Sequence, residues 1–327
     1  MDKLLPGARI RPPWGMPRIL PIPARLLGTA FLTGDRAGHS LSRGRLRGAD
    51  VGHPFHGVSS VNLDLRSILG LCRCYEPRLK PGEVFSHTTA AALLGIPLPA
   101  LPETTVLHVS STGSVSRPRT RVVIGHRLSV ADFVMVGGLP VTDPETTWCQ
   151  MAQFLSKEDL VAAGDYLVSG TRLAGGSRTE SLSSIPRLMA AAKRRRGGRG
   201  ATKLAWALSF LRVGVDSRPE SLTRLLLIAA GIPEPAINAP TLVDGGRLTL
   251  HADLTWEQWM VVLEYEGDNH RISARTFRNN IERRELFESA GWRYIRVTAD
   301  DLFLRPDVFT ERVKRILRDR GWPGMHL

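Results

Sequence analysis

Residues 249–270 read TLHADLTWEQWMVVLEYEGDNH, and the alternation of apolar and polar side chains predicts two β-strands joined by a tight turn. We expect the strands at Leu248–Trp256 and Trp259–Glu266, with Glu257 and Gln258 as the turn. Successive side chains of a strand point to opposite faces. One face is therefore apolar and carries Leu250, Ala252, Leu254, Val261, Leu263 and Tyr265. The other face carries His251, Asp253, Glu264 and Glu266.

The polar face of this hairpin indicates a cation site. A two-residue turn places Trp256 opposite Trp259, Asp253 opposite Val262 and His251 opposite Glu264. Three carboxylates and an imidazole within diagonal reach repel one another unless a cation lies among them. The natural occupant is a hard divalent cation such as Mg²⁺, which takes oxygen ligands. A polar, solvated outer face of a hairpin is the alternative.

The segments around the hairpin predict an α/β unit. Ser217 to Glu220 opens an apolar run that ends at Gly231 with a proline beyond it, which is typical of a helix. A charged amphipathic helix is expected at Ala274–Ala290, a strand in WRYIRVT from Trp292, and a closing helix at Pro306–Arg320. The expected order is helix, strands, helix, strand, helix.

With these residues in place, the block from about Ser217 to Gly321 resembles the PD-(D/E)xK nuclease superfamily. More narrowly, it resembles the very-short-patch-repair-like endonuclease family. The resemblance rests on Glu220, Asp253, the run Glu264-Tyr-Glu266-Gly267, His270-Arg271 and the strand Gly291-Trp-Arg-Tyr-Ile-Arg-Val. It covers about a third of the chain and implies an α-β-β-β-α-β core with a mixed sheet over residues 213–327.

The resemblance also implies roles for these side chains. Asp253 and Glu264 are expected to bind Mg²⁺ or Mn²⁺, which holds the scissile phosphate and helps to generate hydroxide. Glu220 is a third expected metal ligand, although Ser217-x-x-Glu220 is also a capping box. The superfamily has Lys where this chain has Glu266, so a second metal or His270 is expected to assist the water. A structural role for His270 is the alternative.

Charge points to a polyanion partner. The net charge is +13, and residues 1–60 hold nine Lys and Arg against three acids. Residues 61–203 hold eighteen against eleven, whereas residues 204–327 hold seventeen of each sign. A basic platform beside an acidic metal site suits DNA. Arg271 and Arg275, which lie nearest the acidic cluster in the sequence, are the expected phosphate contacts, although part of the basic stripe on their helix can form salt bridges with glutamates.

The upstream regions resemble a second family, the AbiEi-type antitoxins of abortive-infection toxin–antitoxin systems. Residues 1–23 are Pro-rich and expected to be irregular. Residues 24–60 are similar to a winged helix, with a helix around Leu26–Phe31 and a recognition helix lined by Arg43, Arg45 and Arg47 for DNA contact. Residues 61–170 resemble the C-terminal α+β domain of that family. Residues 171–212 are expected to be a basic linker and helix. A small domain that only packs on its neighbour is the alternative for residues 24–60.

The remaining features bound the function. Cys72, Cys74 and Cys149 lack zinc spacing and are expected to be free thiols of a cytoplasmic protein. His87 is expected to form a local hydrogen bond at a helix N-terminus, with a catalytic role as the alternative. We expect a metal-dependent DNA endonuclease. The alternatives are a non-catalytic DNA-binding regulator or antitoxin with a decayed nuclease domain and a cognate toxin as partner, or a protein that binds only another protein.

Overall fold

The computed structural model describes residues 20–99, 106–113, 115–128, 132–173, 176–267 and 274–324, with side chains described in the same ranges except at 274–279. Contacts within the chain divide it into two compact units, residues 1–81 and 82–327. Among the residues so described, no helix is long and apolar enough to cross a membrane. The three cysteines are free and buried, as expected.

The first unit contains a small antiparallel sheet in the order β1-β3-β2, built from β1 (Thr29–Leu32), β2 (Val51–Gly52) and β3 (Val58–Val61). Short 3-10 turns connect these strands, and helix α1 (Ile68–Tyr75) packs against β1 and β3. The core of the sheet consists of buried apolar side chains, namely Leu26, Phe31, Leu41, Leu46, Val51 and Val61.

The predicted winged helix is wrong for this unit. Residues 29–32 form a strand where a helix was expected, and the recognition helix is a single 3-10 turn at Arg45–Arg47. Between residues 20 and 67, the structure describes no α-helix. The physical reason is the glycine spacing, because Gly at 28, 34, 38, 44 and 48 leaves no run long enough to recover the free energy of helix nucleation.

The second unit begins with a six-stranded mixed sheet in the order β6-β7-β5-β4-β9-β8. Its strands are β4 (Glu83–Phe85), β5 (Leu107–Thr112), β6 (Arg119–Thr120), β7 (Val123–Leu128), β8 (Phe133–Val136) and β9 (Leu139–Thr142). The pairs β5–β7 and β4–β9 are parallel. Helix α2 (His87–Leu93) packs on β5 and on α3 (Pro144–Met151).

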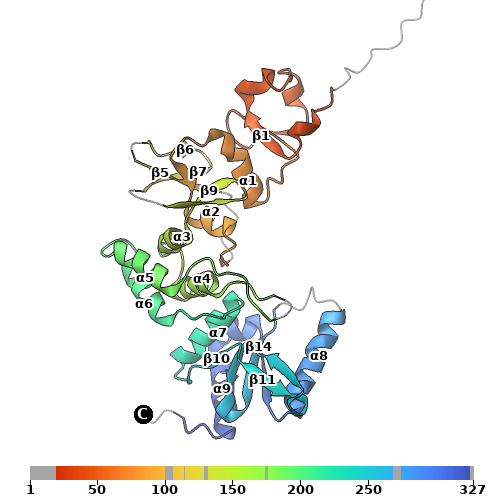
Figure 1. The fold of residues 1–327 in the computed structure, drawn as a ribbon, viewed down its shortest axis with the longest axis vertical. Coiled ribbons are helices and arrows are strands. Elements are labelled where there is room, and N and C mark those ends of the chain that lie inside the picture. The colour runs from red at the N-terminus through yellow and green to blue at the C-terminus, as the bar shows by residue number, and fades with distance from the viewer. Residues whose placement is uncertain are drawn as a thin grey trace, which may run out of the picture. The chain divides into compact units, whose positions relative to one another are not determined.

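Four helices follow this sheet in the chain, and they join the two halves of the second unit (Figure 1). They are α4 (Lys157–Ser169), α5 (Ile185–Arg194), α6 (Ala201–Phe210) and α7 (Arg218–Ala229). Asp143, Ser156 and Ser217 cap α3, α4 and α7, and the cap at Ser217 is the one that the sequence analysis predicts. Because α4 packs against both α6 and α7, the expected domain boundary near residue 213 does not divide the unit.

The C-terminal part has three layers. A four-stranded mixed sheet, in the order β10-β13-β14-β15, lies between α7 and α9 on one face and α8 on the other (Figure 1). Its elements are β10 (Ala236–Ile237), β13 (Leu254–Trp256), β14 (Val261–Tyr265), α8 (Ala274–Ser289), β15 (Arg293–Val297) and α9 (Pro306–Asp319). Strands β14 and β15 are parallel and α8 connects them. A separate hairpin pairs β11 (Pro240–Val243) with β12 (Leu248–His251). The α/β class and the expected order of elements are confirmed.

The hairpin that decides the site differs from the expectation in its turn. The strand predicted at 248–256 is two strands, β12 and β13, which are separated at Ala252 and Asp253. The turn spans four residues because Glu257–Trp259 forms a 3-10 turn and Met260 adopts a left-handed conformation (φ 51°). Trp256 therefore pairs with Val261, two residues away from the expected register. The shift places Asp253 opposite Glu264, where His251 was expected. The break between β12 and β13 also divides the expected apolar face, which is wrong as a single face. Leu250 and Ala252 pack with Val262 on the side of α8, whereas Leu254, Val261 and Leu263 face α7 and α9.

Candidate functional site

An acidic cavity of about 470 Å³ lies at the ends of β12 and β14, and Asp253, Glu264 and Glu266 line it, whereas Glu220 does not. Its walls come from the segments around Asp216 and Asn238, the hairpin strands, α8 and β15. The lining residues are Arg172, Asp216, Asn238, Thr249, Leu250, His251, Asp253, Glu264, Tyr265, Glu266, Gly267, Asn280, Arg283 and Tyr294. The polar face read from the sequence is thus a concave surface and not a flat solvated one.

Asp253 occupies the break between β12 and β13. Its Oδ2 accepts a hydrogen bond of 2.7 Å from the backbone N–H of Tyr265. Burial raises the pKa of Asp253 well above its usual range, and the negative charges of Glu220 and Glu264 raise it further. An aspartate that interrupts a strand and faces two other carboxylates stabilises the fold poorly, which is consistent with a functional role.

Glu220 is buried in the first turn of α7, where the capping alternative is observed and the metal-ligand role stays a prediction. Ser217 Oγ caps the helix by accepting from the Glu220 N–H at 3.4 Å. The Glu220 carboxylate accepts from the Asp216 N–H at 3.0 Å and from the Asn238 side-chain amide at 3.4 Å. Burial raises the pKa of Glu220. This carboxylate therefore serves the helix N-terminus and also acts electrostatically on Asp253.

Glu264 is the most strongly held of the acids. Arg283 of α8 donates to it at 2.6 Å and also bonds the His251 carbonyl, and the Tyr294 hydroxyl donates to it at 3.0 Å. Burial and the charge of Glu264 raise the pKa of Tyr294, so the phenol remains a donor. A cation at this carboxylate has to compete with Arg283.

Glu266, the residue in the position of the superfamily lysine, also pairs with an arginine. Its partner is Arg296 of β15 at 3.4 Å. Asp216, at another wall of the cavity, pairs with Arg172 at 2.9 Å and with Arg178 at 2.5 Å. Within the described ranges, Asp253 and Glu220 differ from these acids because they accept hydrogen bonds from neutral groups only.

The three expected metal ligands do not form a closed cage. Of the His, Cys, Asp and Glu side chains that the structure describes, only His87, His108 and His126 form a group of three whose ligand atoms all lie within 4.8 Å of one another. Asp253 and Glu264 line the cavity, and Glu220 acts on Asp253 electrostatically without lining it. A metal ion held by all three would draw their oxygens together, with Asp253 as the central ligand.

Several other expected residues fall elsewhere. His270 and Arg271 lie outside the described residues, as does the side chain of Arg275, whose backbone belongs to α8. In the first unit, Arg43 and Arg47 are exposed. The interpretation of Arg45 as a DNA contact is corrected, because this side chain is 7% exposed, pairs with Asp50 and donates to the Leu20 carbonyl.

Sequence reasoning missed the basic and aromatic side chains of the site. Arg283 is one of several arginines of α8, and helical spacing alone does not show which of them faces the sheet. Tyr294 is a buried core residue of β15, and the alternation of that strand does not show that its hydroxyl also reaches Glu264. Arg172 lies far upstream in the sequence, so no local pattern connects it with the hairpin.

Comparison with known proteins yields distant relatives. The chain is 27% identical over 230 residues to the uncharacterized proteins MT2308 and Rv2248 of Mycobacterium tuberculosis strains CDC 1551 / Oshkosh and H37Rv. The match covers 70% of this chain and 79% of each relative. No family model matches the chain, and no solved structure matches it.

Proposed function

We propose that this protein is a metal-dependent hydrolase of DNA phosphodiester bonds, with its reaction centre in the acidic cavity. One observation carries this proposal. Asp253 lies within electrostatic reach of Glu220 and Glu264 in an open cavity, and among the described residues no arginine pairs with Asp253 or Glu220. Carboxylates that are crowded together and form no ion pair of their own either keep a proton or bind a metal ion, and the charge of Arg283 offsets only part of the rise in the pKa of Asp253. The proposed hydrolysis of a phosphodiester bond uses the metal-bound state of these carboxylates.

The donor set fits Mg²⁺ or Mn²⁺, because both prefer carboxylate oxygens. Asp253, Glu220 and Glu264 would hold the ion, which would neutralise charge on the phosphate and lower the pKa of a bound water. Glu264 would exchange its partner Arg283 for the ion. The released guanidinium, 2.6 Å from Glu264 in the present arrangement, would then be available to a phosphate oxygen.

His251 is the side chain best placed to accept a proton from water. It lines the cavity, and its Nδ1 lies 2.9 Å from the Asn238 carbonyl oxygen, which can only accept. Nδ1 therefore carries the proton and Nε2 keeps a lone pair. This histidine takes the role that the sequence suggested for His270, and it compensates for the absence of a lysine at Glu266.

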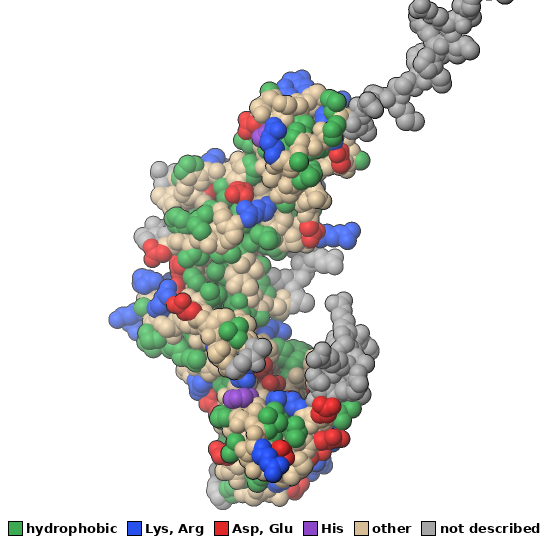
Figure 2. Space-filling view, turned by 45° about the vertical axis from the view of Figure 1, so that its right-hand side comes forward, with side chains coloured by type: hydrophobic (Ala, Val, Ile, Leu, Met, Phe, Trp, Pro, Cys, Tyr) green, Lys and Arg blue, Asp and Glu red, His purple; other side chains and the backbone are tan. Residues whose placement is uncertain are grey.

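The DNA backbone would contact basic residues that lie outside the cavity. The segment 193–200, KRRRGGRG, includes the end of α5 and the turn after it, and it exposes Lys193, Arg194, Arg196 and Arg199. Figure 2 shows Lys and Arg side chains gathered on the side of the molecule formed by α5 and α6. This segment belongs to the same compact unit as the cavity, and it would take the role of the recognition helix expected within residues 24–60, where the structure describes no α-helix.

The test is cleavage of double-stranded and mismatched DNA by the full chain in Mg²⁺ or Mn²⁺. Asp253→Asn keeps the size of the side chain and removes its charge, so we expect at least about a 100-fold loss of rate with unchanged circular dichroism. The matched control is Glu257→Gln, an exposed acid in the adjacent turn. A folded Asp253→Asn protein with full activity would show that the reaction centre lies elsewhere.

The second candidate is a non-catalytic DNA-binding regulator or antitoxin. It is favoured by the arginines that neutralise Glu264 and Glu266, because a carboxylate already paired with a guanidinium binds a cation less readily. This alternative predicts salt-dependent DNA binding without cleavage in either metal, and the same affinity in Asp253→Asn. Metal-dependent cleavage that Asp253→Asn abolishes would exclude it.

A further inference from the structure

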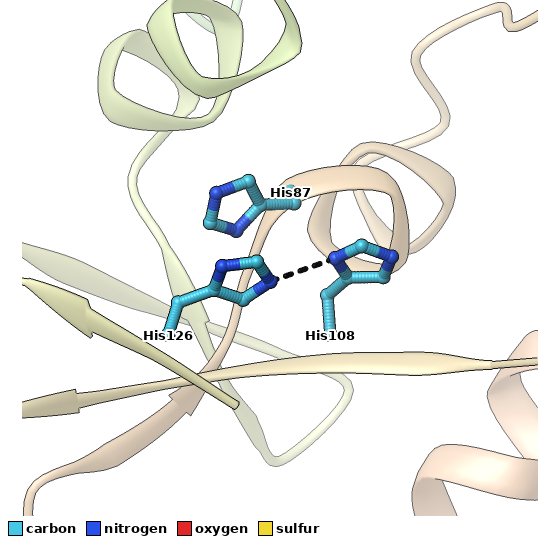
Figure 3. A group of neighbouring side chains, drawn as sticks. All are labelled: His87, His108 and His126. Carbon is cyan, nitrogen blue, oxygen red and sulfur yellow. Dashed lines mark hydrogen bonds between the residues drawn. The ribbon is translucent and has the colours of Figure 1, made fainter. Parts of the chain in front are cut away.

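Three histidines from separate elements meet in the first half of the second unit. His87 begins α2, His108 lies on β5 and His126 lies on β7 (Figure 3). His108 Nδ1 and His126 Nε2 are 2.9 Å apart, and the rings of His87 and His126 stack with centroids 3.8 Å apart. The exposed fractions of His87 and His108 are 6% and 7%. The acidic cavity uses none of these residues.

The fold places these rings together by strand register and by an unusual backbone conformation. In the parallel pair β5–β7, His108 aligns with Ile124 and Ser110 aligns with His126, so the two imidazoles are diagonal neighbours on one face. His87 has a left-handed backbone (φ 54°), a conformation that is unfavourable for an L-residue with a side chain. Its N–H donates to Gln150 Oε1 at 2.8 Å. Strain held in place by a buried hydrogen bond is typical of functional positions.

The imidazoles are in the form that binds metals. Burial lowers the pKa of His87 to about 3 and the pKa of His108 to about 4, and in both cases the neighbouring imidazole of His126 contributes. Burial also lowers the pKa of His126. Neutral imidazole is the commonest metal ligand in proteins. In addition, Gln150 Nε2 is buried and has no hydrogen-bond partner in the described part of the chain. An N–H donor beside His87 is therefore left unsatisfied by the protein itself.

We propose that His87, His108 and His126 bind a divalent transition-metal ion, with Zn²⁺ as the first choice. Three nitrogen ligands suit Zn²⁺ far better than Mg²⁺, which prefers oxygen. Ligands of a tetrahedral Zn²⁺ site with Zn–N of about 2.05 Å are separated by about 3.3 Å, so the 2.9 Å pair would open by only a few tenths of an ångström. Three protein ligands leave the fourth position open.

The charges around the cluster define what fills that open position. The positive charge of Arg195 acts on His87, and that of Arg117 acts on His126, so each lowers the pKa of its histidine. A bare dication would be repelled by both guanidiniums. An anionic fourth ligand, such as hydroxide or chloride, offsets that repulsion because it lowers the net positive charge of the metal ion and its surroundings.

The first test is calorimetric titration of the chelator-treated full chain with Zn²⁺. We expect one equivalent to bind with sub-micromolar affinity, and His126→Gln or His108→Gln to weaken binding at least about 100-fold. His56→Gln, at an exposed histidine of the first unit, is the matched control and should bind as the wild type does. Asp253→Asn should also retain the Zn²⁺ site, which separates this test from that of the proposed nuclease centre.

The second test does not depend on variants that fold. X-ray absorption at the zinc edge of the wild-type complex should give about three nitrogen neighbours at about 2.0–2.1 Å. A shell of oxygen alone, an absence of Zn²⁺ binding, or unchanged affinity in folded His126→Gln would each overturn the assignment.

Discussion

At the scale of single residues, the fully buried guanidinium of Arg224 explains why the second unit is continuous. It bonds Asp165 at 3.1 Å, Glu234 at 2.9 Å and the Phe210 carbonyl at 2.8 Å, so it joins α4, α6 and α7. Asp165 also accepts from the Arg212 N–H and from Ser221, each at 2.7 Å. Burial raises the pKa of Asp165 to about 6, and the carboxylate is therefore ionised at neutral pH.

Removing the charge of Asp165 should destabilise the protein strongly. Asp165→Asn keeps the shape of the side chain but leaves Arg224 buried with only Glu234 as a charged partner. We expect the free energy of unfolding at pH 7.5 to fall by about 3–5 kcal/mol, measured by urea denaturation. The control is Glu288→Gln, which breaks the exposed pair with Arg284 and should change stability by less than about 0.5 kcal/mol. A loss of less than about 1 kcal/mol in Asp165→Asn would contradict this account of the interface.

Asp253 leads to a prediction about proton release. Burial and the carboxylates of Glu220 and Glu264 raise its pKa, so protons compete with a cation for this side chain. The affinity for Mn²⁺ should therefore increase with pH until the carboxyl is ionised in the free protein. Titration calorimetry at pH 6, 7 and 8.5, in buffers of different ionisation enthalpy, measures both the affinity and the protons released. Affinity that is independent of pH would indicate that Asp253 is not a ligand.

At the scale of secondary-structure elements, the packing of α2 on β5 and β7 should depend on pH. The pKa values of His87 and His108, about 3 and about 4, lie below the 6.5 of a free imidazole. Between these values the unfolded chain binds protons that the folded chain does not. Metal-free protein should therefore lose stability as pH falls from about 6.5 to about 4, as measured by urea denaturation. The double variant His108→Gln/His126→Gln should show a shallower dependence, and an equal slope in both proteins would contradict the role of these histidines.

The elements that could be predicted from the sequence are those with local signals. Ser156 and Ser217 begin helices by capping, and the alternation in Val261–Tyr265 identifies the buried face of β14. The turn at Met260 was not predictable, because a left-handed methionine has no sequence signature. The strand at Thr29–Leu32 was missed because it has too few apolar residues to distinguish the two-residue period of a strand from the 3.6-residue period of a helix.

The candidate site was predictable to the same extent. Asp253 and Glu264 share a face by alternation, which depends only on the period of a strand. The pairing of Glu264 with Arg283 depends on how α8 packs on the sheet, and α8 lies 10 or more residues further along the chain. The histidine cluster required the parallel register of β5 and β7, which joins residues 108 and 126 through a non-local pairing. Both features belong to tertiary structure.

At the scale of the whole molecule, the distribution of charge and the division into units both bear on where the proposed DNA partner would bind. The acidic cavity and the basic segment 193–200 belong to one compact unit, since the network around Arg224 joins the intervening helices. The first unit contributes exposed Arg43 and Arg47 on a small β-rich fold. The net charge of +13 therefore acts through surfaces without a recognition helix, and we expect binding to depend on phosphate more than on base sequence.

This arrangement predicts a steep and specific salt dependence. Each phosphate contact adds about 0.9 to the slope of log affinity against log salt concentration. Replacing Lys193, Arg194, Arg196 and Arg199 by Gln should therefore reduce the slope by up to about 3.6, if all four contact phosphate, and weaken binding equally on unrelated duplexes. Both effects can be measured by fluorescence anisotropy with labelled duplexes at KCl concentrations from about 50 to about 200 mM. The control replaces exposed Arg284 and Arg305, away from this segment, and should leave the slope unchanged. If the fourfold variant keeps the wild-type slope while the protein still binds DNA, the phosphates contact another surface. The single variants Arg43→Gln and Arg47→Gln then decide whether that surface is in the first unit.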